Sequence, residues 1–222
     1  MADVLVIGAS RGIGAELVRQ HHAAGDRVVA TARDDAGLAR TAALGATALR
    51  LDVTDSAGAA DFGRRIDGEA FHTVWFVAGV YGPRTTGLQP PTEAEFDAVM
   101  HTNVLAAMRL LPTLAQALAP VGRIAVLSSR MGSMGLRSNA NGWLYRASKA
   151  ALNSVVTDAS LALDGRAVCV ALHPGWVRTD MGGEGADLAV ERSVAELRAT
   201  VAGLTLADSG SFLNHDGQHL DW

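Results

Sequence analysis

The sequence has 222 residues, 49% of them hydrophobic, which suits one large buried core in a single domain. The formal net charge is −4 and the basic residues form no block that could follow a phosphate backbone, so nucleic acid is not expected as a partner. No apolar stretch approaches the ~18 residues that a membrane-spanning helix needs, so no membrane association is expected.

The first residues already form a strand-like segment, Val4–Gly8, and do not show the charged and apolar regions of a signal peptide. The single cysteine, Cys169, cannot form an internal disulfide and lies in an apolar run where a buried thiol is expected. We therefore expect a cytoplasmic protein.

Short apolar segments alternate along the chain with segments in which apolar residues recur at helical spacing. Such alternation is typical of parallel strands joined by crossover helices, and runs of Val, Ile and Leu indicate strands buried on both faces. The sequence therefore predicts an α/β fold: a single Rossmann-type domain with a doubly wound, seven-stranded parallel sheet and helices on both faces. The predicted strands are Val4–Gly8, Arg27–Ala32, Ala46–Val53, Thr73–Ala78, Gly122–Ser129, Arg166–His173 and Ser211–Asn214.

A glycine-rich segment connects the first predicted strand to the first predicted helix. Glycines permit a tight turn and close approach of the backbone, while amides at a helix N-terminus face the diphosphate of a dinucleotide. The segment therefore predicts a cofactor site. The residues assigned to it are Gly8, Ser10, Arg11, Gly12, Ile13 and Gly14.

The same segment also fits the pattern G-x-S-x-G, the nucleophile elbow of serine hydrolases. Ser10 would be the nucleophile, and Asp180 and His215 follow it in the required order. Such an elbow normally follows several strands, whereas this one would follow the first. Phosphate binding is the favoured interpretation, and a serine hydrolase is the less favoured one.

The end of the second predicted strand indicates which dinucleotide binds. An NAD site has an acidic residue there for the ribose hydroxyls, whereas a 2′-phosphate needs cationic partners. This strand ends with Ala32 and is followed by Arg33, and Arg11 projects toward the same region from the glycine-rich turn. Two guanidinium groups can clamp a phosphate, so the sequence favours NADP(H), although Asp34 or Asp35 could still reach the ribose.

Tyr145 and Lys149 lie one helical turn apart at the start of a predicted helix, so they share one face. The ordinary pKa of a tyrosine is about 10, and a neighbouring ammonium is expected to lower it by stabilising the phenolate. The pair is a candidate acid–base catalyst. The same spacing also occurs between ordinary neighbours on a helix face.

Taken together, several motifs resemble the classical short-chain dehydrogenase/reductase family over essentially the whole chain. These motifs are the glycine-rich turn, Asn103, Ser129, the Tyr145 and Lys149 pair, and the segment 173–179. The sequence around Ser129, Tyr145 and His173 is most similar to the branch of C-factor-like and sniffer-like carbonyl reductases.

The resemblance implies an NADP(H)-dependent oxidoreductase that transfers hydride between the nicotinamide and a carbonyl or alcohol substrate. Tyr145 would be the general acid in reduction and the general base in oxidation, and Lys149 would hold the nicotinamide ribose. Ser129 would bind the substrate oxygen, and Asn103 would position a water that extends the proton relay past Lys149. No metal would be needed.

The resemblance also implies further cofactor contacts along the carboxyl ends of the strands. Asp52 and Val53 would contact adenine, and Ala78 and Gly79 would let the fourth strand approach the cofactor. The residues that would flank the nicotinamide are Pro174, Gly175, Val177 and Thr179. A cofactor half over about residues 1–125, a catalytic and substrate half over about 126–222, and a homodimer or homotetramer are also implied.

The chain departs from the family pattern in three respects that concern the site. Ile7 replaces the usual threonine before the first glycine, and Phe76 and Val77 replace the usual asparagines before Ala78. The spacing from Ser129 to Tyr145 is also longer than is common in the family. Because adjacent strand residues face opposite sides, Ser128 should point away from a substrate that Ser129 contacts.

A second function remains open, namely a regulatory protein that binds the dinucleotide with little turnover. The complete set Asn103, Ser129, Tyr145 and Lys149 argues against it, because a sensor has no need of the phenol.

Other residues have less specific interpretations. His21 and His22 are expected on a solvated helix face, and His173 is expected to be packed and hydrogen-bonded or to line the site. Apolar residues on the loops beside the site form a substrate wall or ordinary loop packing, and these are Met131, Met134, Trp143, Trp176 and Met181.

Overall fold

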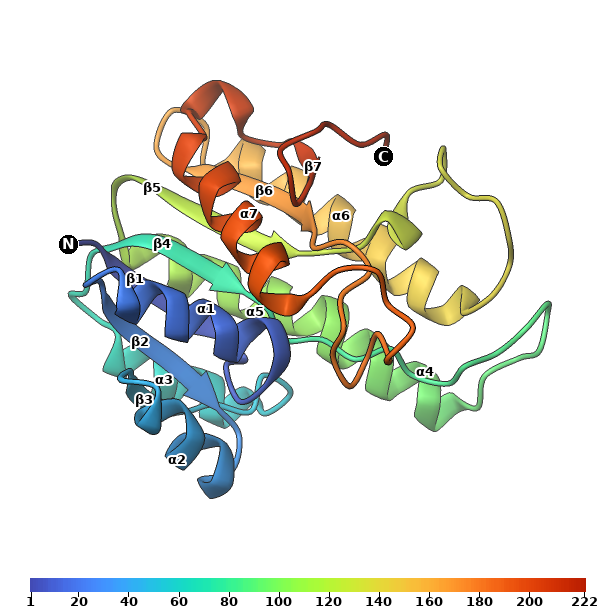
Figure 1. Cartoon of the computed structure of the whole chain (residues 1–222), viewed down its shortest axis with the longest axis horizontal. Helices are drawn as coiled ribbons and strands as arrows, with labels where there is room; N and C mark the ends of the chain where they lie inside the picture. Colours follow the sequence, from blue (N-terminus) through green and yellow to red (C-terminus); the bar gives the residue numbers. More distant parts are fainter.

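Seven parallel strands form one sheet in the order β3-β2-β1-β4-β5-β6-β7, which confirms the predicted doubly wound fold (Figure 1). The computed structural model describes all residues, 1–222. The strands are β1 Asp3–Ile7, β2 Arg27–Ala32, β3 Thr47–Arg50, β4 Phe71–Phe76, β5 Leu118–Leu127, β6 Val168–His173 and β7 Phe212–Asn214. The helices are α1 Gly12–Ala23, α2 Asp35–Ala43, α3 Ser56–Arg65, α4 Glu93–Met100, α5 Ala106–Gln116, α6 Trp143–Ala162 and α7 Val190–Gly203, with a π-helical turn η1 His101–Leu105 and short 3-10 turns η2 Arg130–Gly132 and η3 Leu206–Asp208.

Most predicted strand boundaries differ from the structure by one or two residues, and the two larger differences, at the end of the third strand and the start of the fifth, have local reasons. The third strand ends at Arg50 and not at Val53, because the carboxylate of Asp52 accepts hydrogen bonds from Thr54 and closes a turn there. The fifth strand begins at Leu118, before the predicted Gly122, and continues through Val121, whose φ of 59° is unusual for a β-branched residue.

Each central strand buries side chains on both faces of the sheet, as the unbroken apolar runs predicted. In β1, Leu5 and Ile7 pack on the face covered by α3, α5 and α6, while Val4 and Val6 pack on the face covered by α1 and α7. Figure 1 shows α1 and α7 together on one side of the sheet and α5 and α6 on the other. The two layers hold the strands in register, so the loops that follow them leave the sheet at one edge.

The strand order reverses between β1 and β4, where successive crossovers turn to opposite sides. In an open α/β sheet this reversal leaves a crevice at the carboxyl ends of the strands, where ligands bind. The glycine-rich turn after β1 and the Ala78–Gly79 segment after β4 both lie there.

The π turn η1 interrupts the helical segment between β4 and β5. It links α4 to α5 and contains Asn103, whose side chain is completely buried. Single π turns are rare in proteins, and many of those that occur lie at functional sites. No helix of the chain is both long and apolar enough to cross a membrane.

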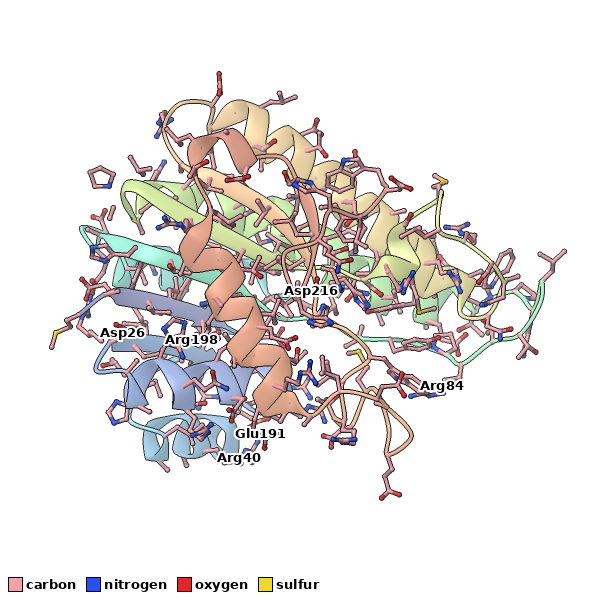
Figure 2. All side chains as sticks on the ribbon, turned by 45° about the horizontal axis from the view of Figure 1, so that its top comes forward. Asp26, Arg40, Arg84, Glu191, Arg198 and Asp216 are labelled. Atoms are coloured by element: carbon pink, nitrogen blue, oxygen red, sulfur yellow. The ribbon has the colours of Figure 1, made fainter.

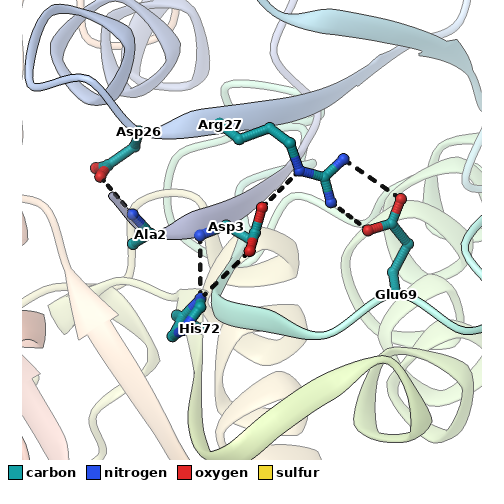
Figure 3. Close-up of polar contacts among 6 residues, drawn as sticks. All are labelled: Ala2, Asp3, Asp26, Arg27, Glu69 and His72. Carbon is teal, nitrogen blue, oxygen red and sulfur yellow. Dashed lines mark hydrogen bonds and ion pairs between the residues drawn. The ribbon is translucent and has the colours of Figure 1, made fainter.

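Polar contacts join the amino ends of the strands at the opposite edge of the sheet (Figure 3). Arg27 forms ion pairs with Asp3 and Glu69, and the main-chain amide of Asp3 donates to His72. Asp26 accepts a hydrogen bond from the main chain of Ala2. These contacts hold the starts of β1, β2 and β4 together, away from the crevice.

His21 is buried, so the prediction of a solvated face was wrong for this residue, whereas His22 is exposed. The indole of Trp75 donates to Nε2 of His21 at 3.1 Å, and Nδ1 lies 2.8 Å from the carboxylate of Asp26. Burial lowers the pKa of His21, although the hydrogen bond to Asp26 opposes this shift. A neutral imidazole satisfies both partners, donating to Asp26 and accepting from Trp75.

This network predicts a pH dependence of stability. A histidine whose pKa is lowered by folding contributes stability that is present above its unfolded pKa of about 6.5 and is lost as the pH falls below that value. We expect the free energy of unfolding to decrease as the pH is lowered from 7.5 to 5.5. In His21→Gln this decrease should be smaller, by at most about 1 kcal/mol. Urea denaturation at the two pH values measures it. His22→Gln is the control and should keep the wild-type pH dependence; the same result for His21→Gln would contradict the prediction.

Candidate functional site

The glycine-rich turn lies between β1 and α1 as predicted, and two of its glycines have no room for a side chain. Gly8 has a φ of +89°, and a Cβ there would lie 2.9 Å from the main chain of Ala78. A Cβ on Gly14 would lie 2.2 Å from the carbonyl oxygen of Gly8. Helix α1 begins at Gly12 with no side-chain cap on its free amides. This arrangement is typical of a site for an anionic group at a helix N-terminus.

The two arginines predicted to bind a 2′-phosphate both extend into solvent beside this turn. Arg33 has three-quarters of its side chain exposed and lies 3.8 Å from Asp34. Arg11 is similarly exposed and forms an ion pair with Asp180, at 3.0 Å, on the loop after β6. Arg40 was not predicted; its Nε donates to the carbonyl oxygen of Ser10 and brings a third guanidinium to this end of the crevice (Figure 2).

Asp52 and Val53, the predicted adenine contacts, lie just after β3. Val53 is buried, and the Asp52 carboxylate is held by the main-chain amide and hydroxyl of Thr54, which lowers its pKa. Both hydrogen bonds from Thr54 go to Oδ1 of Asp52, and Oδ2 accepts none within the chain.

Tyr145, Lys149 and Ser129 come together at the carboxyl ends of β4 and β5, and all three are buried. Helix α6 carries Tyr145 and Lys149 on one face, and the Lys149 ammonium lies 5.8 Å from the centre of the Tyr145 ring. The same ammonium donates to the carbonyl oxygen of Leu127 at 2.8 Å. An ammonium has three N–H donors, so two remain for another ligand.

Burial dominates the ionisation of this pair. It raises the pKa of Tyr145 to about 12, while a hydrogen bond with Ser129 acts in the opposite direction. Burial also lowers the pKa of Lys149 to about 8. The predicted lowering of the Tyr145 pKa by Lys149 is therefore wrong for the protein without cofactor, because loss of solvent dominates and Lys149 is not among the groups that shift this pKa.

The two adjacent serines have different partners. The hydroxyl of Ser128 donates to Oδ1 of Asn153 on α6, in the interior. Ser129 accepts a hydrogen bond from the amide of Met131 at 3.1 Å, and its hydroxyl is the one that interacts with Tyr145. Ser129 is thus the serine that faces the phenol of Tyr145.

Asn103 joins the loop after β4 to α6. Its Oδ1 accepts from the amide of Val80, and its Nδ2 donates to the carbonyl of Val80 and to the hydroxyl of Ser148, each at 2.8–2.9 Å. Both N–H donors of the side chain are therefore used. A Cβ on Gly79 would lie 3.3 Å from Oδ1 of Asn103 and 3.5 Å from Nζ of Lys149, so these groups meet around one glycine.

The loop after β6 lies against the glycine-rich turn, as its predicted role requires. The methyl group of Thr179 would be 3.4 Å from a Cβ on Gly12. Ser193 on α7 donates to the carbonyl oxygen of Pro174, and Val177 pairs with Leu188 in an isolated bridge. The positive φ of Gly175, +86°, lets the chain turn between these two contacts.

His173 is half-buried at the end of β6, but the predicted hydrogen bond is absent from its Nδ1, which is buried and unpaired. Burial, with the nearby charge of Arg130, lowers its pKa to about 3. Of the apolar residues predicted around the site, Met134, Trp176 and Met181 are exposed, by 71%, 55% and 40%, and are available to a ligand.

The hydrolase interpretation fails on geometry. Asp180 is paired with Arg11, and His215 is paired with Glu196 at 2.6 Å. The two residues that would form the relay with Ser10 are therefore engaged elsewhere, and no hydrogen bond joins Ser10 to a histidine.

The fold and the site together define a dinucleotide-binding oxidoreductase, and a family model described as short chain dehydrogenase matches residues 2–187. The chain belongs to the short-chain dehydrogenase family. It is 32% identical over the whole of both chains to 1-hydroxy-2-glutathionyl-2-methyl-3-butene dehydrogenase of Rhodococcus sp. (strain AD45).

Two solved structures resemble it over their full lengths. One is a carbonyl reductase from Pseudomonas aeruginosa PAO1 in complex with NADP, with a TM-score of 0.88 and 33% identity over 100% of both chains. The other is the carbonyl reductase Sniffer of D. melanogaster, with a TM-score of 0.89 and 28% identity over 100% of both chains. The predicted resemblance to this family and to its carbonyl reductases is confirmed.

The crowding at Gly14 predicts a large effect of one methyl group. Gly14→Ala places a Cβ against the Gly8 carbonyl and should destabilise the fold by about 1–3 kcal/mol, the usual cost of overpacking. Gly203→Ala is the matched control, because Gly203 has no neighbour within 4 Å and lies at the end of α7. Urea denaturation compares them. Equal stability of the two variants would show that the turn can relax and would contradict the prediction.

Proposed function

We propose that this protein is an NADP(H)-dependent carbonyl reductase or alcohol dehydrogenase in which Tyr145 is the general acid and base. The observation that carries the proposal is the buried cluster of Tyr145, Ser129 and Lys149 at the carboxyl edge of the sheet. The relatives named as dehydrogenase and carbonyl reductases support the reaction type.

The residues of the crevice fit a dinucleotide with a 2′-phosphate. The free amides of α1 suit the diphosphate, and the two unused donors of Lys149 suit the hydroxyls of the nicotinamide ribose. Arg33 and Arg11 suit the 2′-phosphate, with Arg11 leaving Asp180 to reach it. The NADP complex of the Pseudomonas carbonyl reductase supports the same cofactor here.

The bound nicotinamide supplies or accepts the hydride. In reduction, the carbonyl carbon would gain the hydride, the π electrons of the C=O bond would move to the oxygen, and Tyr145 would donate its phenolic proton to that oxygen, which gives the alcohol. The hydroxyl of Ser129 donates a hydrogen bond to the same oxygen, and the Lys149 ammonium stabilises the phenolate that remains. Because the pKa of Tyr145 is about 12, the phenol is protonated at neutral pH, which is the form that carbonyl reduction needs.

Asn103 acts in this proposal mainly as a positioning residue. Its two side-chain donors are bound to Val80 and Ser148, so a water in the proton relay would contact only an oxygen of Asn103. The first half of the chain, about 1–125, would hold most of the cofactor, and the second, about 126–222, most of the substrate.

We further propose a cytoplasmic homodimer or homotetramer that acts on a small-molecule carbonyl or alcohol. The lone cysteine, Cys169, is buried and is not available for a disulfide. Leu105 and Met108, on η1 and α5, and Leu161, on α6, are exposed apolar residues, which supports pairing through these helices.

Tyr145→Phe tests the acid–base role. The variant keeps the ring but lacks the proton donor, so turnover of NADPH with a panel of aldehydes, ketones and quinones should fall by about 10²–10⁴-fold. The dissociation constant for NADPH, measured by fluorescence, should change less than about twofold, because the ring itself is retained. An unchanged rate would remove the enzymatic role of Tyr145 and favour the regulatory alternative.

Arg33→Ala tests the choice of cofactor. Loss of a charge-assisted hydrogen bond, worth about 1.5–3 kcal/mol, should weaken NADPH binding by about 10- to 100-fold and leave NADH binding nearly unchanged. Arg192→Ala is the matched control, since Arg192 is equally exposed but lies on α7 and pairs with Glu196. An equal loss of affinity for both dinucleotides in Arg33→Ala would contradict the phosphate contact.

A further inference from the structure

Tyr81, on the loop after β4, stacks on Tyr145. The two ring centroids lie 4.6 Å apart and the ring planes differ by 21°. The residue before it, Val80, is held through both its amide and its carbonyl by the side chain of Asn103. The position of the Tyr81 ring is therefore tied to the same buried amide that organises the rest of the site.

The loop that carries Tyr81 also docks on the start of α6. Gly142, which precedes this helix, donates its amide to the carbonyl oxygen of Thr85 at 2.9 Å. A Cβ on Gly142 would lie 2.4 Å from the hydroxyl of Tyr81, so the phenol is packed against bare main chain. These contacts place one face of the Tyr145 ring under a second aromatic ring and leave little room for either to turn.

Arg84 extends the stack on the outer face of Tyr81. Its guanidinium carbon lies 5.0 Å from the centre of the Tyr81 ring, within the range of a cation–π interaction. The same guanidinium donates to the carbonyl oxygen of Met181, at 2.8 Å, on the loop after β6. Figure 2 shows Arg84 on the side of the molecule where these loops lie, away from Asp26 at the opposite edge. One line of contacts thus runs from Met181 through Arg84 and Tyr81 to Tyr145.

We propose that Tyr81 is a positioning residue for Tyr145: its ring holds the catalytic phenol in place and shields it from water, while Arg84 secures Tyr81 to the loop after β6. The proposal rests on the proposed catalytic role of Tyr145. Rotation about the Cα–Cβ bond of Tyr145 would carry its hydroxyl away from Ser129, and the ring stacked on one face of Tyr145 opposes movement toward that side. Lys149 lies near the Tyr145 ring on the same helix, and Ser129 interacts with its hydroxyl from the segment after β5, so Tyr81 supplies the constraint from the third direction.

The composition of the chain permits a direct test, because Tyr81 and Tyr145 are its only tyrosines. In any variant that lacks Tyr81, the ultraviolet absorbance of tyrosinate reports Tyr145 alone. Tyr81→Phe keeps the stacked ring, and Tyr81→Ala removes it and opens the face of Tyr145 to water. Alkaline titration of both variants, with circular dichroism to verify folding at each pH, gives the pKa of Tyr145 in the protein without cofactor.

In Tyr81→Phe, we expect the pKa of Tyr145 to stay above its ordinary value of about 10 and turnover to stay within about threefold of wild type. In Tyr81→Ala, hydration should lower the pKa of Tyr145 by about one unit or more relative to Tyr81→Phe. The kcat for NADPH oxidation with para-nitrobenzaldehyde should fall by about 10- to 100-fold, since a displaced catalytic group costs on that order. The dissociation constant for NADPH should be unchanged.

The proposal is overturned if Tyr81→Ala and Tyr81→Phe give the same pKa of Tyr145 and the same kcat. If Tyr81→Ala does not fold, Tyr81→Leu replaces it, because leucine preserves apolar volume without a flat ring. A kcat of Tyr81→Leu equal to that of Tyr81→Phe would then overturn the proposal. The proposed function fails separately: if Tyr145→Phe leaves turnover unchanged while the pKa of Tyr145 still depends on the Tyr81 ring, then Tyr81 positions Tyr145 but Tyr145 is not the catalyst.

Discussion

The carboxyl edge of the sheet, where the proposed site lies, depends on the burial of one amide side chain, that of Asn103. Three polar groups of its surroundings, the amide and carbonyl of Val80 and the hydroxyl of Ser148, are satisfied by this side chain. A buried polar group that loses its partner costs about 1–3 kcal/mol, so the loop after β4 cannot leave α6 without a large penalty. The π turn η1 brings Asn103 to this position, and its interruption of the helix is compensated by these contacts.

The same attachment determines where the groups of the proposed site lie. Helix α6 carries Tyr145 and Lys149, the two serines directly follow β5, and the loop after β4 brings Tyr81 onto the Tyr145 ring. Water is largely excluded from this cluster. Exclusion of water raises the pKa of the Tyr145 phenol and lowers that of the Lys149 ammonium. In the protein without ligand, burial therefore favours the neutral form of both groups. A site of this kind interacts strongly with the charge that develops on a substrate oxygen.

The cofactor side of the crevice is held more loosely. The ion pair between Arg11 and Asp180 joins the glycine-rich turn to the loop after β6, but both side chains are about three-quarters exposed. Exposed ion pairs contribute little to stability, about 0–1 kcal/mol, so Arg11 can change partner at small cost. Arg84, which donates to the carbonyl of the next residue, Met181, holds the same loop from the substrate side. The loop after β6 is therefore attached on both sides of the crevice by side chains that can be released.

Local patterns in the sequence were sufficient for the fold, the glycine-rich turn and the pairing of Tyr145 with Lys149. Apolar runs report burial on both faces of a strand, glycines report crowded backbone, and residues one turn apart share a helix face, so each signal depends only on near neighbours. The roles of the site residues remain predictions. What the sequence could not reveal depends on residues distant along the chain. The π turn at Asn103, the burial of His21 beneath Trp75, the pairing of Arg11 with Asp180 and the stacking of Tyr81 on Tyr145 each join segments that only the packed sheet brings together. The ionisation of Tyr145 shows the same limit: the neighbouring lysine was visible in the sequence, but the loss of solvent that raises the pKa of Tyr145 is a property of the whole fold.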